Sequence, residues 1–149
     1  MEIIEYFSCV EKDKFTEQIE KNEWSAAKFL ATLLKEHRLQ DTLGGWANLF
    51  LLIDGDKLIS FLTLSAQDCI SEPSFRPWLG FFHTAPEYRG KHYGKLLIDY
   101  ACQVAKEQGY QTIYIATDHV DLYEKYGFTY LENRTDIWGI DSRIYKKQI

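Results

Sequence analysis

Apolar residues recur along the chain with two different spacings, which predicts a protein that mixes strands and helices. The first apolar run, residues 2–7, predicts a strand. Two helices are expected next, over residues 13–21 and 22–39, with Asn22 as the N-cap of the second. Five side chains of that second helix are predicted to share one face: Trp24, Ala27, Leu30, Ala31 and Leu34.

The middle of the chain predicts a β-hairpin and one further strand. Asp54-Gly55 separates two runs that are rich in strand-forming residues, and such a pair suits a two-residue turn in which both positions need positive φ. We therefore expect antiparallel strands over residues 47–53 and 57–65. A polar loop over residues 66–77 and a fourth strand over 78–84 should follow.

The clearest helical pattern lies between two further strands. Apolar or aromatic residues at positions 93, 96, 97, 100, 101, 104 and 105 share one helix face, and Gly109 is the expected C′ residue. The strand over 78–84 should therefore be joined to a parallel strand over 112–117 by a right-handed crossover. A short helix over 120–126, ended by Gly127, and strands over 128–133 and 142–148 complete the chain. The order βααββ–βαβ–αββ predicts an α/β fold with a mixed sheet and helices on its faces.

Length, charge and cysteine content narrow the classes of function. A chain of 149 residues predicts one domain, residues 1–149. The net charge of −5 argues against nucleic acid as the main partner and suits a cationic small molecule, although solubility explains it equally well. Three cysteines without metal-ligand spacing predict a reduced, cytoplasmic protein with no metal. No signal peptide or membrane span is evident, so no membrane partner is expected.

The stretch PEYRGKHYGKLL, residues 86–97, lies where a strand gives way to a helix. A helix N-terminus leaves backbone N–H groups free and carries partial positive charge, so it favours anions. Gly90 and Gly94 would let a phosphate approach the backbone, while Arg89, Lys91 and Lys95 add charge. The stretch therefore predicts a phosphate cradle, and a solvated basic helix start is the alternative.

The kind of phosphate is narrowed by the motifs that this stretch lacks. The dinucleotide fingerprint G-x-G-x-x-G is missing. The segment APEYRGKH is close to a P-loop, but His92 stands where a magnesium-binding Ser or Thr is required. A pyrophosphate that needs no metal fits better, and a nucleotide-phosphate enzyme is kept as a rival.

The same stretch resembles the acyl-CoA signature of the GNAT N-acetyltransferase superfamily. That signature is Arg/Gln-x-x-Gly-x-Gly/Ala, in which Arg89 and Gly94 match the first and last positions and His92 replaces a central glycine. The segment LYEKYGF, residues 122–128, resembles the later Tyr-x-x-x-Gly-Phe segment of the family. The family's Asn-x-x-Ala before that tyrosine is absent, and TDH, residues 117–119, stands there instead. The expected element order also matches the family along almost the whole chain.

The resemblance implies acetyl transfer from acetyl-CoA to an amine by direct attack. It implies that pantetheine lies along the edge of the fourth strand, at the backbone groups of Phe82, His83 and Thr84. One of those N–H groups would polarise the thioester. The pyrophosphate would lie on the amides from Arg89 to Lys95, and His92 would have to be helical to present its amide. The full set of residues expected there is Arg89, Gly90, Lys91, His92, Tyr93, Gly94 and Lys95.

The catalytic groups follow from the same resemblance and from elementary acid–base chemistry. Tyr123 matches the family tyrosine that faces the CoA sulfur and is the candidate general acid, with core packing as the alternative; Tyr126 is expected to pack. Asp118 and His119 are candidate bases, although Asp118 could equally be an N-cap. His83 is expected to be packed on the face of Leu79 and Phe81, and a chain of waters could also carry the proton.

The acceptor is narrowed only to a primary amine of a small molecule or a peptide. Aromatic residues could wall its cleft, and Arg143 could pair with a substrate carboxylate or be an exposed strand residue. A CoA-binding sensor without turnover and an interaction module without a ligand are the further alternatives. The oligomeric state is open, with a homodimer among the choices. The rings considered for the cleft are Phe61, Trp78, Trp138 and Tyr145.

Overall fold

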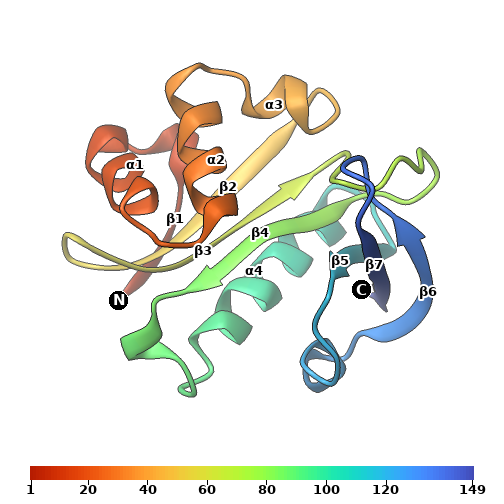
Figure 1. Ribbon diagram of the computed structural model, residues 1–149. Helices are drawn as coiled ribbons and strands as arrows, with labels where there is room; N and C mark the ends of the chain where they lie inside the picture. The colour runs from red at the N-terminus through yellow and green to blue at the C-terminus, as the bar shows by residue number, and fades with distance from the viewer.

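The structure is a computed structural model that describes residues 1–149, and it contains one seven-stranded mixed sheet (Figure 1). The strand order is β1-β2-β3-β4-β5-β7-β6, and β4 and β5 form the one parallel pair. This confirms the predicted mixed sheet and the parallel crossover. The strands are β1 (Glu2–Glu5), β2 (Ala47–Asp54), β3 (Lys57–Ser65), β4 (Trp78–Thr84), β5 (Thr112–Thr117), β6 (Thr129–Thr135) and β7 (Asp141–Gln148).

Helices cover both faces of this sheet, with α1, α2 and α3 on one side and α4 on the other (Figure 1). Three short 3₁₀ turns join the elements. The helical segments are α1 (Lys12–Glu20), α2 (Ser25–Lys35), α3 (Leu39–Thr42), α4 (Tyr93–Glu107), η1 (Tyr6–Ser8), η2 (Pro86–Tyr88) and η3 (Tyr123–Tyr126). None of the helices is long and apolar enough to cross a membrane.

The N-terminal elements differ from the prediction at their ends. The first strand stops at Glu5 rather than at residue 7, because the Glu5 carboxylate accepts hydrogen bonds from the N–H groups of Phe7 and Ser8. Helix α2 begins at Ser25 rather than at residue 22, and Trp24 is its N-cap. Asn22 instead accepts a hydrogen bond from the Trp24 N–H at 2.9 Å, forming a turn outside the helix.

Helix α2 buries the expected apolar stripe, apart from its first member. Trp24 lies outside the helical repeat and keeps 38% of its surface exposed, whereas Leu33 joins the buried face. The helix packs with α1 over a core shared with β2 and β3. The sequence pattern did not predict α3, whose four residues are too few to show a helical period. The buried residues of α2 are Ala27, Leu30, Ala31, Leu33 and Leu34.

Helix α4 closes the opposite face. Its buried residues include Leu97, Ile98, Ala101 and Ala105, and these pack against a second core under β2, β3 and β4. The helix ends at Glu107 with Gln108 as its C-cap, and Gly109 follows with a φ of +95°, as expected for a C′ glycine. The crossover β4-α4-β5 therefore places the start of α4 beside the far end of β4.

Strand β4 is distorted at its middle, and this changes which side chains share a face. Phe81 has a φ of +47°, and the register with β3 shifts between the pairs Phe61–His83 and Thr63–Gly80. Leu79 consequently packs under α4, whereas Phe81 packs on the side of α1 and α2. The expectation that Leu79 shares a face with Phe81 and His83 is wrong, because a bulge interrupts strict alternation.

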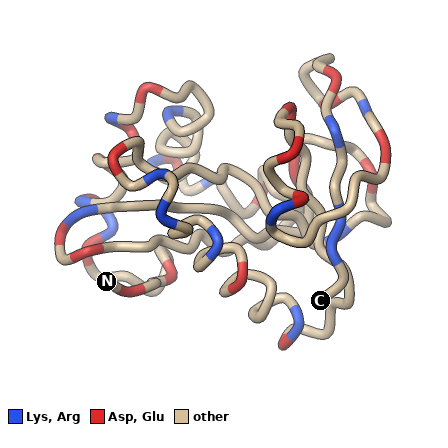
Figure 2. Tube along the Cα trace, turned by 90° about the horizontal axis from the view of Figure 1, so that it is seen from below, with Lys and Arg blue, Asp and Glu red and all other residues tan.

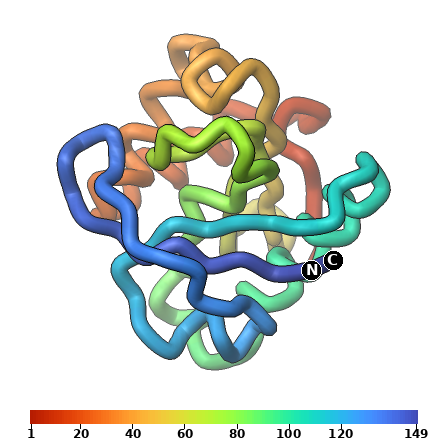
Figure 3. Tube along the Cα trace, turned by 90° about the vertical axis from the view of Figure 1, so that its right-hand side faces the viewer, coloured from red at the N-terminus to blue at the C-terminus, as the bar shows by residue number.

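The C-terminal hairpin β6–β7 pairs with β5 through β7. Its connecting loop turns toward α2 (Figure 3). There the Trp138 ring contacts Phe29 with centroids 6.4 Å apart. The short helix expected over 120–126 is the 3₁₀ turn η3, which ends at Gly127 in a left-handed conformation. Lysines and arginines are interspersed with acidic residues along the trace (Figure 2).

Candidate active site

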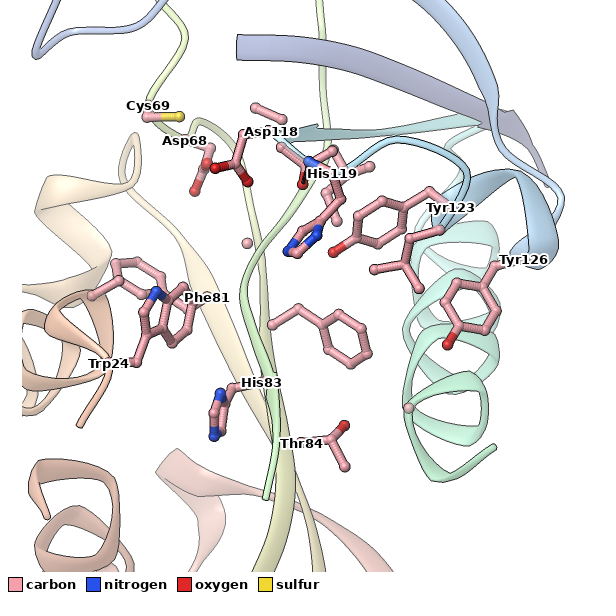
Figure 4. A pocket seen from close by; sticks show the side chains of 18 of the residues that line it. Trp24, Asp68, Cys69, Phe81, His83, Thr84, Asp118, His119, Tyr123 and Tyr126 are labelled. Carbon is pink, nitrogen blue, oxygen red and sulfur yellow. Dashed lines mark hydrogen bonds between the residues drawn. The ribbon is translucent and has the colours of Figure 1, made fainter. Parts of the chain in front are cut away.

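A cavity of about 1370 Å³ opens where β4 and β5 part. The two strands pair only at Trp78–Tyr114 and Leu79–Ile115, and beyond Leu79 their edges diverge. Residues of β4, the start of α4, the end of β5 and the turn η3 line the opening, together with α2 and two loops. Figure 4 shows its wall from close by. The separated strands thus provide a deep cleft through the middle of the sheet.

One end of the cavity is formed by the segment that leads into α4. No backbone N–H group from Gly90 to Lys95 donates to a protein acceptor, as expected for a helix start. Arg89 fastens this segment to β4, because its Nε donates to the Thr84 carbonyl at 3.0 Å. A Cβ added to Gly90 would meet nothing within 4 Å. Free amides, open space and nearby positive charge fit a diphosphate group.

Two positions of this segment behave differently from the prediction. His92 is the N-cap and is left-handed, with a φ of +63°, so the expectation that it is helical is wrong. A turn this tight before the helix needs positive φ, which is the conformation that glycine adopts without strain. Gly94 is also required for packing, because a Cβ there would lie 2.5 Å from Cζ of Phe82.

Tyr123 lies on η3 with only 5% of its surface exposed, yet it lines the cavity. Its ring packs against Phe82, Phe128 and Tyr145, with centroids about 6 Å apart. Burial raises the pKa of the phenol, and the negative potential of Tyr126 and Asp118 raises it further. The hydroxyl therefore keeps its proton at neutral pH. It points toward the His119 ring (Figure 4).

The other two candidate catalytic residues follow β5. Asp118 and His119 are both exposed and both line the cavity. The backbone N–H of His119 donates to Oγ1 of Thr117 at 3.1 Å in a turn after β5, and the N-cap of η3 is Leu122 rather than Asp118. The structure thus brings these two residues to the same cavity as Tyr123. Tyr126 was expected only to pack, but it also lines this cavity.

His83 lies on β4 between two aromatic rings. Its imidazole stacks on Trp24 with centroids 5.6 Å apart and also packs against Phe61. Burial lowers its pKa, and the charge of Arg89 lowers it further, so the ring is neutral at pH 7. This packed position agrees with the expectation for its side chain, and the residue also lines the cavity.

A family model described as the acetyltransferase (GNAT) family matches residues 8–128. The chain belongs to the GNAT acetyltransferase family. This confirms the resemblance drawn from the two motifs, since the matched region includes both. No match was found among curated proteins.

Several solved structures share the fold of this GNAT family member. Aminoglycoside 6′-acetyltransferase type Ii superposes with a TM-score of 0.71 at 19% identity, over 99% of this chain and 97% of that one. An aminoglycoside 6′-N-acetyltransferase complexed with coenzyme A gives 0.70 at 16% identity, over 99% and 97%. A GNAT family acetyltransferase from Elizabethkingia anophelis with acetyl-CoA bound gives 0.60 at 20%, over 78% and 87%. At these identities the likeness shows the fold.

The second end of the cavity in this GNAT protein holds residues that the sequence did not single out. Asp68, in the loop between β3 and β4, lines the cavity and forms no ion pair. It is half-buried, and the surrounding protein shields its carboxyl group from water, which raises its pKa to about 6. The segment 66–77 reads as an ordinary polar loop, and only the fold shows that it turns into the cleft.

Aromatic side chains form the rest of this end. Trp24 and Phe29 come from the start of α2, Phe81 from the bulge of β4, and Trp138 from the β6–β7 loop. Of the four rings considered from sequence, only Trp138 lines the cavity, because Phe61, Trp78 and Tyr145 are fully buried in the core.

Arg143 also lies away from the cavity. Its guanidinium is 4.2 Å from the Tyr130 ring centroid, and its Nε donates to the Tyr145 hydroxyl at 3.0 Å. The idea that it binds a substrate carboxylate is therefore wrong, because β7 directs it onto the aromatic residues of the C-terminal hairpin.

Proposed function

We propose that the protein transfers the acetyl group of acetyl-CoA to the primary amine of a small molecule or a peptide, by direct attack of the amine on the thioester. The observation that carries the proposal is the parting of β4 and β5 after Leu79, which opens a cavity that ends on the free amides before α4. A cleft with an anion-binding end and an acidic, aromatic end suits a diphosphate-bearing donor and an amine acceptor.

The free amides from Gly90 to Lys95 hold the diphosphate in this proposal, with Arg89 beside them. Backbone groups of Phe82, His83 and Thr84 bind the pantetheine arm, because these residues line the cavity beyond the last β4–β5 pair. One of their N–H groups donates to the thioester oxygen as charge develops on it. Holding both substrates in one cleft lowers the entropic cost of the reaction.

Tyr123 is the proposed general acid. A phenol whose pKa is raised by burial is fully protonated at neutral pH, so it can give a proton to the departing thiolate. Asp118 and His119 lie on the same side of the cavity and stay candidate proton acceptors. The aromatic rings at the other end suit the body of an amine through apolar contact and cation–π attraction. Two of the similar structures are aminoglycoside acetyltransferases, which supports an amine as the acceptor.

The proposal is tested by measuring thiol release from acetyl-CoA in the presence of amines, peptides and polyamines. We expect turnover that depends on the added amine, and a melting temperature that rises with acetyl-CoA because a ligand that binds the folded state stabilises it. Binding of acetyl-CoA without turnover on any amine would instead support a CoA sensor. Binding of a magnesium nucleotide in place of acetyl-CoA would overturn the proposal.

A further inference from the structure

Asp68 lies beside β4 at the point where β4 and β5 separate. It lies over Gly80, the first residue of β4 beyond the last pair with β5. A Cβ on Gly80 would be 2.4 Å from Oδ1 of Asp68, so the carboxylate fits there only because residue 80 has no side chain. Asp68 is thus seated at the apex of the opening between the two strands.

A second polar group faces the same point. Oγ1 of Thr63 lies 3.1 Å from the position of that Cβ, is fully buried and has no hydrogen-bond partner. Buried hydroxyl groups are normally paired, because leaving one unpaired costs free energy. The Thr63 hydroxyl is therefore an unpaired polar group close to the Asp68 carboxylate, which lines the cavity beside its aromatic wall.

The loop that carries Asp68 is tied to the wall on the acceptor side. The N–H of Ile137, in the β6–β7 loop, donates to the carbonyl of Cys69 at 2.9 Å. The next residue, Trp138, contacts Phe29 of α2. Asp68 is therefore held at the acceptor end of the cavity rather than at the α4 end, and in Figure 4 it lies at the end away from Thr84 and His83.

We propose that Asp68 receives the amino group of the acceptor, binds it as an ammonium ion and removes the proton that must leave before attack. This inference rests on the proposed function. The nitrogen then forms its bond to the thioester carbon, and the carbon–sulfur bond breaks as Tyr123 gives its proton to the sulfur. The second nitrogen proton restores the Tyr123 phenol, and Asp68 returns the first proton to solvent.

The charged surroundings of Asp68 suit this role. The titratable groups near it are Cys69 on its own loop, whose thiol also feels the charge of Asp136, and Asp118 and His119, which line the same cavity. No lysine or arginine pairs with Asp68, and β4 presents only Gly80 at this point. An incoming ammonium ion would be its first positive partner. A carboxyl group whose pKa is about 6 is ionised at pH 7 and remains basic enough to accept a proton.

The decisive variant is Asp68→Asn, compared with Asp121→Asn, which removes an exposed carboxylate that does not line the cavity. We expect Asp68→Asn to lower kcat/KM for the amine by about 10²- to 10⁴-fold, the range for loss of a general base, with acetyl-CoA affinity unchanged. The wild-type kcat/KM should rise with an apparent pKa near 6, and this rise should be absent from the Asn variant. Asp121→Asn should match the wild type throughout.

Stability provides a readout that does not depend on turnover. The folded pKa of Asp68, about 6, exceeds the unfolded value of about 3.9, so its ionisation opposes folding as pH rises. The melting temperature of Asp68→Asn should therefore exceed that of the wild type increasingly between pH 4 and pH 7. A residue that merely supports the fold would give a less stable variant.

Gly80→Ala tests the placement without changing charge, since its Cβ would displace the carboxylate. We expect it to lower kcat/KM in the same direction while the protein stays folded, as judged by its melting curve. If the wild type turns over and Asp68→Asn turns over equally fast, the role of Asp68 is overturned while the proposed function stands. Absence of turnover on every amine, with acetyl-CoA bound, would overturn the proposed function as well.

Discussion

The two ends of the cavity are built from different kinds of chain segment. The end at α4 comes from one continuous stretch, Arg89 to Lys95, and offers backbone amides and basic side chains. The opposite end collects Asp68, Trp24, Phe29 and Trp138 from three distant segments and offers a carboxylate and aromatic surfaces. The first end suits the diphosphate of a donor that stays the same. The shape and charge of the second end can change with each substitution in a loop.

The largest effect is expected at the α4 end. Gly94→Asp should abolish acetyl-CoA binding, because its Cβ would lie 2.5 Å from Phe82 and its charge would repel a diphosphate. Calorimetric titration should show a loss of at least about a hundredfold, or ~2.7 kcal/mol. Glu107→Asp, at the far end of the same helix, is the matched control and should bind normally. Unchanged binding by Gly94→Asp would place the diphosphate elsewhere.

The next largest effect is expected at Tyr123, which lies between the two ends of the cavity. Tyr123→Phe should lower kcat by about 10²-fold or more, because the departing thiolate loses its proton donor, while acetyl-CoA affinity stays the same. Steady-state kinetics and calorimetry measure the two quantities separately. Tyr126→Phe removes a hydroxyl from the neighbouring ring and should have little effect. A loss of affinity with unchanged kcat would contradict the role of Tyr123 as an acid.

A smaller effect is expected at the aromatic wall. Trp138→Ala should raise KM for the amine about tenfold, or ~1.4 kcal/mol, because the acceptor loses one apolar surface. Acetyl-CoA affinity should not change, which would separate the two ends experimentally. Ile140→Ala, in the same exposed loop but outside the cavity, is the control. Equal KM values for the two variants would show that the acceptor binds away from this loop.

The smallest effect concerns the backbone of the cradle. His92→Val should lower the free energy of unfolding by about 1–2 kcal/mol, because a β-branched residue is strained at a φ of +63°. His92→Gly adopts this conformation freely and should retain both folding and acetyl-CoA binding. Denaturant unfolding measures the difference. If His92→Val were as stable as the wild type, the left-handed cap would not be needed in solution.

The sequence allowed three of the seven strands to be predicted with their bounds, namely β3, β4 and β5. The alternation of apolar and polar residues and the residues that favour turns are local properties of the chain, so they can be read without knowledge of the tertiary structure. The bulge at Phe81 was not predicted, because no local signal marks a residue that is forced to a positive φ by its neighbours in the sheet. The candidate site showed the same division: the proposed cradle was expected from one motif, whereas Asp68 looked like any acidic residue in a polar loop.

The sequence by itself predicted the mixed α/β fold and an anion-binding stretch before α4, and the resemblance to the GNAT family singled out the tyrosine that lines the cavity. The elements and the stretch depend on residues that are close together in the chain, and the tyrosine was identified from a short segment that resembles a family motif. The tertiary structure decided where β4 and β5 part, and it brought Asp68 over Gly80 beneath the aromatic wall. Those contacts join segments that are separated by dozens of residues, and only packing of the complete sheet brings them together.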